Sequence, residues 1–161
     1  MKASPIALLT LFAIFSLPCE LRCQESPEIP SMHVRAVTLV LAKTGESLVD
    51  LASAVDGKDE RQSAGNLSDA VYHVKLIVTA VSDLLHTYEV VLQSADKNRV
   101  AQYVRFCIEE YQRRLDLEVR AIDLEIERTQ LFQRPGISNA AIRLRDEVRA
   151  AKQIIADARP R

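Results

Sequence analysis

Apolar residues recur along this chain at alternating steps of three and four positions, in four separate stretches. This spacing places the apolar side chains on one face of an α-helix and predicts four amphipathic helices. The second stretch, residues 66–94, has three apolar positions per heptad, which suits a helix that packs against two neighbours. Its main positions are Leu67, Val71, Val74, Val78, Val81, Leu85, Tyr88 and Leu92.

The first and fourth stretches each begin at a residue type that favours a helix N-terminus. Ser31 is the predicted N-cap of the first helix. Ser138 is that of the fourth, with Ile137 and Ile142 placed to form a hydrophobic staple around it. The first stripe consists of Val34, Val37, Leu41, Thr44, Leu48, Leu51 and Val55. The fourth consists of Ala141, Leu144, Val148, Ala151, Ile155 and Ala158.

The third stretch, residues 98–133, starts one residue out of register with the second, so we expect a tight turn between them and not one continuous helix. The sequence Arg134-Pro135-Gly136 is predicted to end this helix. Its stripe consists of Val100, Val104, Cys107, Tyr111, Leu115, Val119, Ile122 and Ile126, flanked by Leu117, Ala121, Leu124 and Leu131.

The connections between these helices are predicted to be short. Residues 56–65 (DGKDERQSAG) are charged and contain two glycines, which predicts a solvated loop with Asn66 as N-cap of the second helix. Short connections force consecutive helices to run antiparallel. The sequence therefore predicts an all-α fold, an up-down-up-down four-helix bundle over residues 31–158.

The N-terminal segment differs from the rest of the chain. Lys2 is followed by an uncharged apolar run over residues 6–17, which has the length of a signal-peptide core and is short for a membrane span. We interpret residues 1–23 as a signal peptide, with cleavage after Ser16, Cys19 or Cys23, and residues 24–30 as a polar linker. An uncleaved signal anchor is the alternative. The chain is thus expected to be exported, to a periplasm or out of the cell.

The charge balance and the cysteine content argue against nucleic-acid binding and against a disulfide-stabilised fold. From residue 24 onward the chain has 19 basic and 21 acidic residues, a balance that argues against a general attraction to nucleic acid. Residues 24–97 hold 6 basic and 11 acidic groups, and residues 98–161 hold 13 and 10, so the two halves attract each other. Cleavage after Cys23 would leave Cys107 alone, which excludes an intrachain disulfide and makes packing its expected role.

The two histidines of the second helix are candidate ligands of a metal or haem, but the number of residues between them argues against this. His73 and His86 are 13 residues apart, which corresponds to about 140° around a helix and about 20 Å along it, so they cannot share a ligand. The Asp83-x-x-His86 sequence has no second copy, as a di-iron bundle would need. Met32 with His86 is the remaining haem pairing. No cofactor is predicted.

Catalytic motifs are absent from the sequence, and its carboxylates have a simpler interpretation. The third helix carries acidic and basic residues four positions apart, which predicts surface ion pairs along the helix, Asp116 with Arg120 among them. The interpretation as a charged docking face is the alternative. The sequence Asn66-Leu67-Ser68 fits an N-glycosylation site, with the N-cap role of Asn66 as the competing explanation.

Helix lengths suggest a partner-binding site. The third helix is expected to be about 54 Å long and the second about 42 Å, so the hinge after the third helix would extend past the bundle. That hinge carries Leu131, Phe132 and Ile137, which are the predicted partner-binding residues unless they simply close over the helix hairpin.

The sequence therefore predicts an exported, non-enzymatic helical-bundle protein that binds or scaffolds a protein partner, or associates with itself. The alternatives are a bundle that encloses a small apolar ligand, haem or metal, and a secreted signalling or inhibitor bundle. The short connections count against a cytokine topology.

Overall fold

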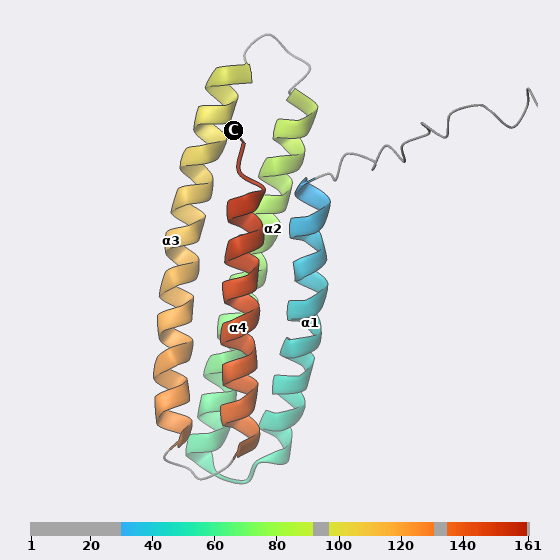
Figure 1. The fold of residues 1–161 in the computed structure, drawn as a ribbon. Helices are drawn as coiled ribbons and strands as arrows, with labels where there is room; N and C mark the ends of the chain where they lie inside the picture. Colours follow the sequence, from blue (N-terminus) through green and yellow to red (C-terminus); the bar gives the residue numbers. More distant parts are fainter. Residues whose placement is uncertain (1–29, 92–96, 131–134, 161) are drawn as a thin grey trace, which may run out of the picture.

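The computed structural model describes residues 30–91, 97–130 and 135–160 of the chain. These residues form four helices, α1 (Pro30–Ala54), α2 (Lys58–Val91), α3 (Lys97–Gln130) and α4 (Pro135–Asp157), and contain no strand. Consecutive helices run antiparallel, side by side in one bundle (Figure 1). The predicted all-α four-helix bundle is confirmed, and α2 and α3 are separate helices.

The core lies along the predicted heptad stripes. The main positions of α1, α2 and α4 are buried or half-buried wherever the structure describes them. The largest fully buried side chains come from all four helices: Leu41 and Leu48, Leu67 and Leu85, Ile108, Leu115 and Ile122, and Ile137, Leu144 and Ile155. Burial of these side chains, at roughly 1.5–3 kcal/mol each, is what holds the helices together.

The helices form a ring in which α1 packs on α2 and α4, and α3 packs on the same two helices. Among the described residues α1 does not contact α3, whereas α2 and α4 meet across the centre. The helices α1 and α2 approach each other closely at Gly45, where a Cβ atom would stand 3.2 Å from Cγ1 of Val71. Glycine at this position therefore lets the two backbones pack tightly.

The predicted loop over residues 56–65 is wrong in extent, because α2 begins at Lys58. The connection is only residues 55–57, and the Arg61 guanidinium closes it by donating to the Val55 carbonyl at 3.1 Å. Asp59 and Glu60 lie in the first turn, where acidic groups complement the helix dipole. Ser63 and Ala64 are fully buried and continue the apolar stripe toward the N-terminus. Asn66 is consequently a mid-helix residue and not an N-cap.

The two predicted serine caps are wrong for the same kind of reason. Both α1 and α4 begin at a proline, Pro30 and Pro135, and proline is favoured in the first helical turn because its missing N–H would have no partner there. Ser31 and Ser138 are therefore helical. Without a cap at Ser138 there is no staple of the predicted form, and Ile137 packs into the core from the first turn of α4.

The predicted stripe of α3 needs a correction near its N-terminal end. Ile108 is fully buried, whereas Cys107 is only half-buried at the side of α3. The predicted flanking residues Leu117, Ala121 and Leu124 are exposed. The apolar residues of α3 thus divide between the core and the outer surface.

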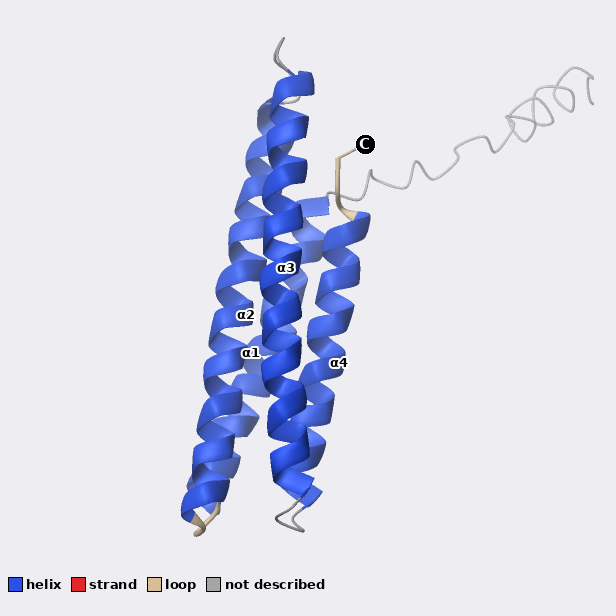
Figure 2. Ribbon diagram, turned by 90° about the vertical axis from the view of Figure 1, so that its left-hand side faces the viewer, coloured by secondary structure: helices blue, strands red, loops and turns tan. Residues whose placement is uncertain are grey.

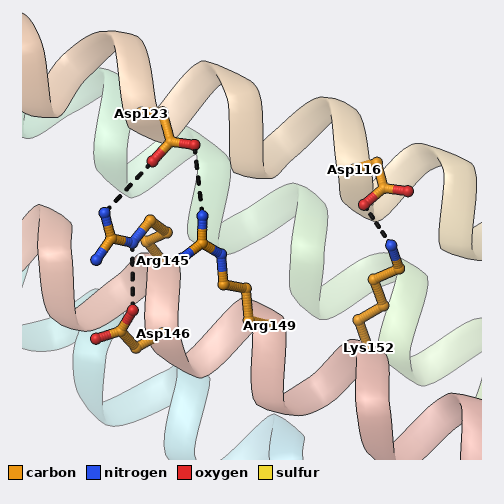
Figure 3. Close-up of polar contacts among 6 residues, drawn as sticks. All are labelled: Asp116, Asp123, Arg145, Asp146, Arg149 and Lys152. Carbon is orange, nitrogen blue, oxygen red and sulfur yellow. Dashed lines mark hydrogen bonds and ion pairs between the residues drawn. The ribbon is translucent and has the colours of Figure 1, made fainter.

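Ion pairs join α3 to α4 at a regular interval (Figure 3). Glu109, Asp116 and Asp123 on α3 are seven residues apart, and so are Arg145 and Lys152 on α4 and Arg159 just beyond its end. They pair in antiparallel order, Glu109 with Arg159, Asp116 with Lys152, and Asp123 with Arg145 at 3.6 Å and Arg149 at 3.8 Å. The predicted pairing of Asp116 with Arg120 is therefore replaced by a pair between helices, whereas the pair of Glu110 with Arg114 is present at 3.4 Å.

The two ends of the bundle differ. Near the α1–α2 and α3–α4 connections the helices end at similar heights, whereas α2 and α3 extend beyond α1 and α4 at the opposite end (Figure 1). The predicted overhang, at the end of α3 next to α4, assumed that α3 is longer than α2. Both helices have 34 residues, and they extend beyond α1 and α4 at the end where α2 is followed by α3 (Figure 1). No described helix combines the length and the apolar character that crossing a membrane requires.

Candidate functional site

The predicted partner-binding residues do not form an exposed apolar group in the described structure. Ile137 is only 2% exposed and belongs to the core. Leu131 and Phe132 lie outside the described residues, so their role stays a prediction. The helix-length argument that singled them out no longer applies, because α2 is as long as α3.

The histidines are spread over the surface, as their spacing predicts. Nδ1 of His73 lies 3.4 Å from the Glu118 carboxylate on α3, and Nδ1 of His86 lies 3.8 Å from the Glu89 carboxylate within α2. Met32, the other half of the remaining haem pairing, is exposed. Within residues 30–91, 97–130 and 135–160, no three His, Cys, Asp or Glu side chains gather as a metal site would require. The ligand-enclosing alternative stays a prediction.

Asn66, in the possible glycosylation sequence, makes a contact between two helices. Its side-chain Nδ2 donates to Oε1 of Glu125 on α3 at 2.7 Å. This bond joins α2 to α3 and is the structural role that replaces the predicted N-cap. Glycosylation at Asn66, and with it the signalling alternative, stays a prediction.

Cys107 and Tyr103 form a small polar contact on the outer part of α3. The hydrogen bond with the Cys107 side chain is the main cause that raises the pKa of Tyr103, with a smaller electrostatic contribution from the same thiol. The phenol therefore stays protonated over the whole physiological range. Neither group has a base or a charged partner that would make it a nucleophile, so this contact points to packing.

An open groove lies between α1 and α2. It has a volume of about 390 Å³ and lies on the outside of the bundle. Gly45, Ala42 and Val71 form its floor, because the small residues of α1 leave room above the close contact of the two helices. Val49 and Tyr72, both exposed, form its apolar walls.

The rim of the groove is charged. Glu46 and Asp50 of α1 stand on one side, and Lys75 of α2 stands on the other. This excess of acid favours a partner that brings a basic side chain to the rim and an apolar one to the floor. The sequence did not predict the groove, because Gly45 and Ala42 lie beside the apolar stripe of α1 and belong to no recognised motif. The signal available was a pair of small residues three positions apart on one helix face.

Polar side chains at the other helix junctions have structural partners. Oγ1 of Thr44, inside the α1 stripe, donates to the Glu147 carboxylate of α4 at 2.6 Å. Ser31 donates both its backbone N–H and its hydroxyl to Glu89, at 3.0 and 2.7 Å. These bonds fix the register of α1 against α4 and α2.

Comparison of the chain with protein-family models, with curated proteins and with solved structures finds no match. The class of protein is therefore defined by the fold alone, an all-α antiparallel four-helix bundle. Its function has to be argued from its surface.

Proposed function

We propose that this chain is an exported, non-enzymatic helical-bundle protein that acts by binding a protein partner. Export rests on the N-terminal sequence, in which Lys2 precedes the apolar run of residues 6–17. The single observation that supports binding is the groove between α1 and α2, with its apolar floor and acidic rim.

The groove suits a partner helix. It is open along its length, and helix-in-groove recognition typically places apolar anchors of an amphipathic helix on such a floor. An anchor side chain over Gly45 and Val71 would be shielded from water by Val49 and Tyr72, which is the arrangement of a binding hot spot. A lysine or arginine one turn away on the partner would reach Glu46 or Asp50.

The test compares two exposed valines of α1. Val49 lines the groove and is 54% exposed, whereas Val40 is 47% exposed and lies outside it. Val49→Asp should reduce partner capture at least about tenfold, because a buried anchor contact is typically worth 2 kcal/mol or more. The measurement is quantitative capture of proteins from the exported fraction by the immobilised full chain.

Val40→Asp is the matched control and should capture the same proteins as the unchanged chain. Glu46→Lys with Asp50→Lys should act like Val49→Asp, since it reverses the rim charge. Equal capture by Val49→Asp and Val40→Asp, with both variants folded by circular dichroism, would remove the groove from the proposal.

A further inference from the structure

The outward side of α3 carries large apolar side chains that the bundle leaves uncovered. Tyr103, Phe106, Leu117 and Leu124 are between 61% and 67% exposed. A surface helix normally presents charged and polar groups to water on this side. In Figure 2 α3 stands in front of the other helices with its outer side open.

These side chains belong to a second heptad pattern on α3, which we call the outer stripe. Its members follow one another at steps of three and four without interruption, which is the spacing of a coiled-coil seam. Three charged residues, Glu110, Arg113 and Arg120, separate the apolar ones. The outer stripe consists of Tyr103, Phe106, Glu110, Arg113, Leu117, Arg120 and Leu124.

The outer stripe is complementary to itself in the antiparallel direction. When two copies of α3 are related by a twofold axis between residues 111 and 112, positions equally far from the axis lie opposite each other. Phe106 then faces Leu117 of the second copy, and Glu110 faces Arg113 of the second copy. Each contact occurs twice. In the next layer Tyr103 meets Arg120, an arrangement that favours a cation–π contact.

The opposite orientation is disfavoured by charge. Parallel packing of two outer stripes would place Glu110 beside Glu110 and Arg113 beside Arg113, and like charges at a seam are repulsive. The antiparallel register converts both repulsions into attractions. The same four charges therefore specify both the partner and its direction.

Charges beside the outer stripe do not oppose this pairing. The acidic residues of α3 that point toward α4, Asp116 and Asp123 among them, are already paired with Lys152, Arg145 and Arg149 (Figure 3). Glu110 has only weak partners within its own helix, Arg113 at 3.7 Å and Arg114 at 3.4 Å, on exposed side chains. These groups can exchange partners at little cost when a second copy arrives.

We propose that the outer stripe of α3 binds the outer stripe of a second copy of this chain, antiparallel, about an axis between residues 111 and 112. This inference goes beyond the proposed function, because it concerns a different surface. No residue of α3 lines the groove between α1 and α2, so this pairing does not use the groove. The dimer would present two grooves to a partner.

A charge-swap experiment tests the pairing and its direction together. Glu110→Arg places arginine opposite Arg113 of the second copy, and Arg113→Glu places glutamate opposite Glu110. Each single change should raise the dimer dissociation constant by about tenfold or more, because it creates two like-charge contacts. The double variant Glu110→Arg with Arg113→Glu restores opposite charges and should return the constant to about its original value. Sedimentation equilibrium of the full chain, as its own cell leaves it, measures all four constants.

Two controls separate this seam from general surface effects. Lys43→Glu reverses one charge on the exposed outer side of α1 and should leave the constant unchanged. Leu117→Ser should weaken the dimer, whereas Leu39→Ser on α1, at a similar exposure of 69%, should not. Circular dichroism establishes that every variant keeps its helices.

The pattern expected is weakening by each single reversal, recovery in the double variant and no change in the two controls. A full chain that stays monomeric up to about 1 mM, a concentration at which even a very weak pair associates, overturns the proposal. The proposal is also overturned if both single charge reversals leave the dimer intact. The same holds if the double variant is well folded but does not regain the original dissociation constant.

Discussion

Glu89 of α2 accepts hydrogen bonds from the first turn of α1. The N-terminal N–H groups of α1 have no partner within their own helix, and Glu89 of α2 accepts both the N–H and the hydroxyl of Ser31. The Ser31 carbonyl in turn accepts from Oγ of Ser82 at 3.0 Å. An acidic residue near a helix N-terminus also complements the helix dipole. The start of α1 is therefore fixed by tertiary contacts.

Replacing Glu89 by alanine should lower the free energy of unfolding by about 1–2 kcal/mol, the usual cost of a lost helix cap. The first turn of α1 should also exchange its amide protons faster. Urea unfolding and hydrogen exchange measure the two effects. Asp83→Ala removes an exposed acid of the same helix and should change stability by less than about 0.5 kcal/mol. Equal effects of the two variants would contradict the capping role of Glu89.

At the scale of the helices, pairing across α3 and α4 depends on one regular interval. Acids seven residues apart on α3 meet bases seven residues apart on α4 and just beyond its end, and the antiparallel direction brings all three pairs into register at once. Such partly exposed pairs contribute little stability individually. Their effect is on register, because sliding α4 by one turn would place Val148 or Ala156 in place of Lys152 and leave Asp116 without a base opposite it. The same regularity appears in the outer stripe of α3, which no other described helix covers.

The start of α2 gives a stability prediction for a glycine. Gly65 lies inside α2, and a Cβ atom there would have open space around it. Gly65→Ala should therefore raise the free energy of unfolding by about 0.5–1 kcal/mol, because alanine favours the helix over the unfolded chain. Thermal or urea unfolding measures the gain.

Gly57→Ala is the comparison for this change. Its Cβ would lie 2.9 Å from the Glu60 carboxylate, in the connection before α2, so no comparable gain is expected. If residues 58–65 formed a loop, Gly65→Ala would bring no gain either, and the helical start of α2 would be refuted.

At the scale of the molecule, the groove and the outer stripe differ in their chemistry. The groove between α1 and α2 has an acidic rim, whereas the outer stripe of α3 has one acid, Glu110, and two bases, Arg113 and Arg120, among its apolar residues. A closed twofold pairing through α3 uses the self-complementary surface and leaves the acidic one for a different partner. This division suits a binding or scaffolding protein that presents two copies of one site.

A native mass spectrum of the chain, produced with its own N-terminal segment and recovered from outside the cytoplasm, tests the export proposal. The expected polypeptide begins after Ser16, Cys19 or Cys23, because the apolar run of residues 6–17 has the character of a signal peptide. Twice that mass should appear at high concentration. A chain that still begins at Met1 would contradict cleavage, and added mass that is lost on denaturation would favour the ligand-enclosing alternative.

The sequence by itself determined the fold class, the number of helices and most of the core. Local periodicity is sufficient for this, since heptad spacing places Leu41, Leu67 or Leu144 on one helix face whatever the neighbours are. It also separated α2 from α3, through the shift of one residue between their stripes. For the site it predicted little. The choice of Leu131, Phe132 and Ile137 depended on a second helix that was predicted to start at residue 66, eight residues after its actual start at Lys58.

Tertiary structure decided what depends on neighbours. Asp116 could form an ion pair with Arg120, one turn along α3, or with Lys152 of α4. The packing of α4 against α3 selects Lys152. Ser31 is a good N-cap by type, yet Glu89 makes a cap unnecessary. The groove exists because Gly45 and Ala42 of α1 stand against Val71 of α2. Such contacts join residues far apart in the chain, and the spacing of residues along one helix carries no information about the surface of another.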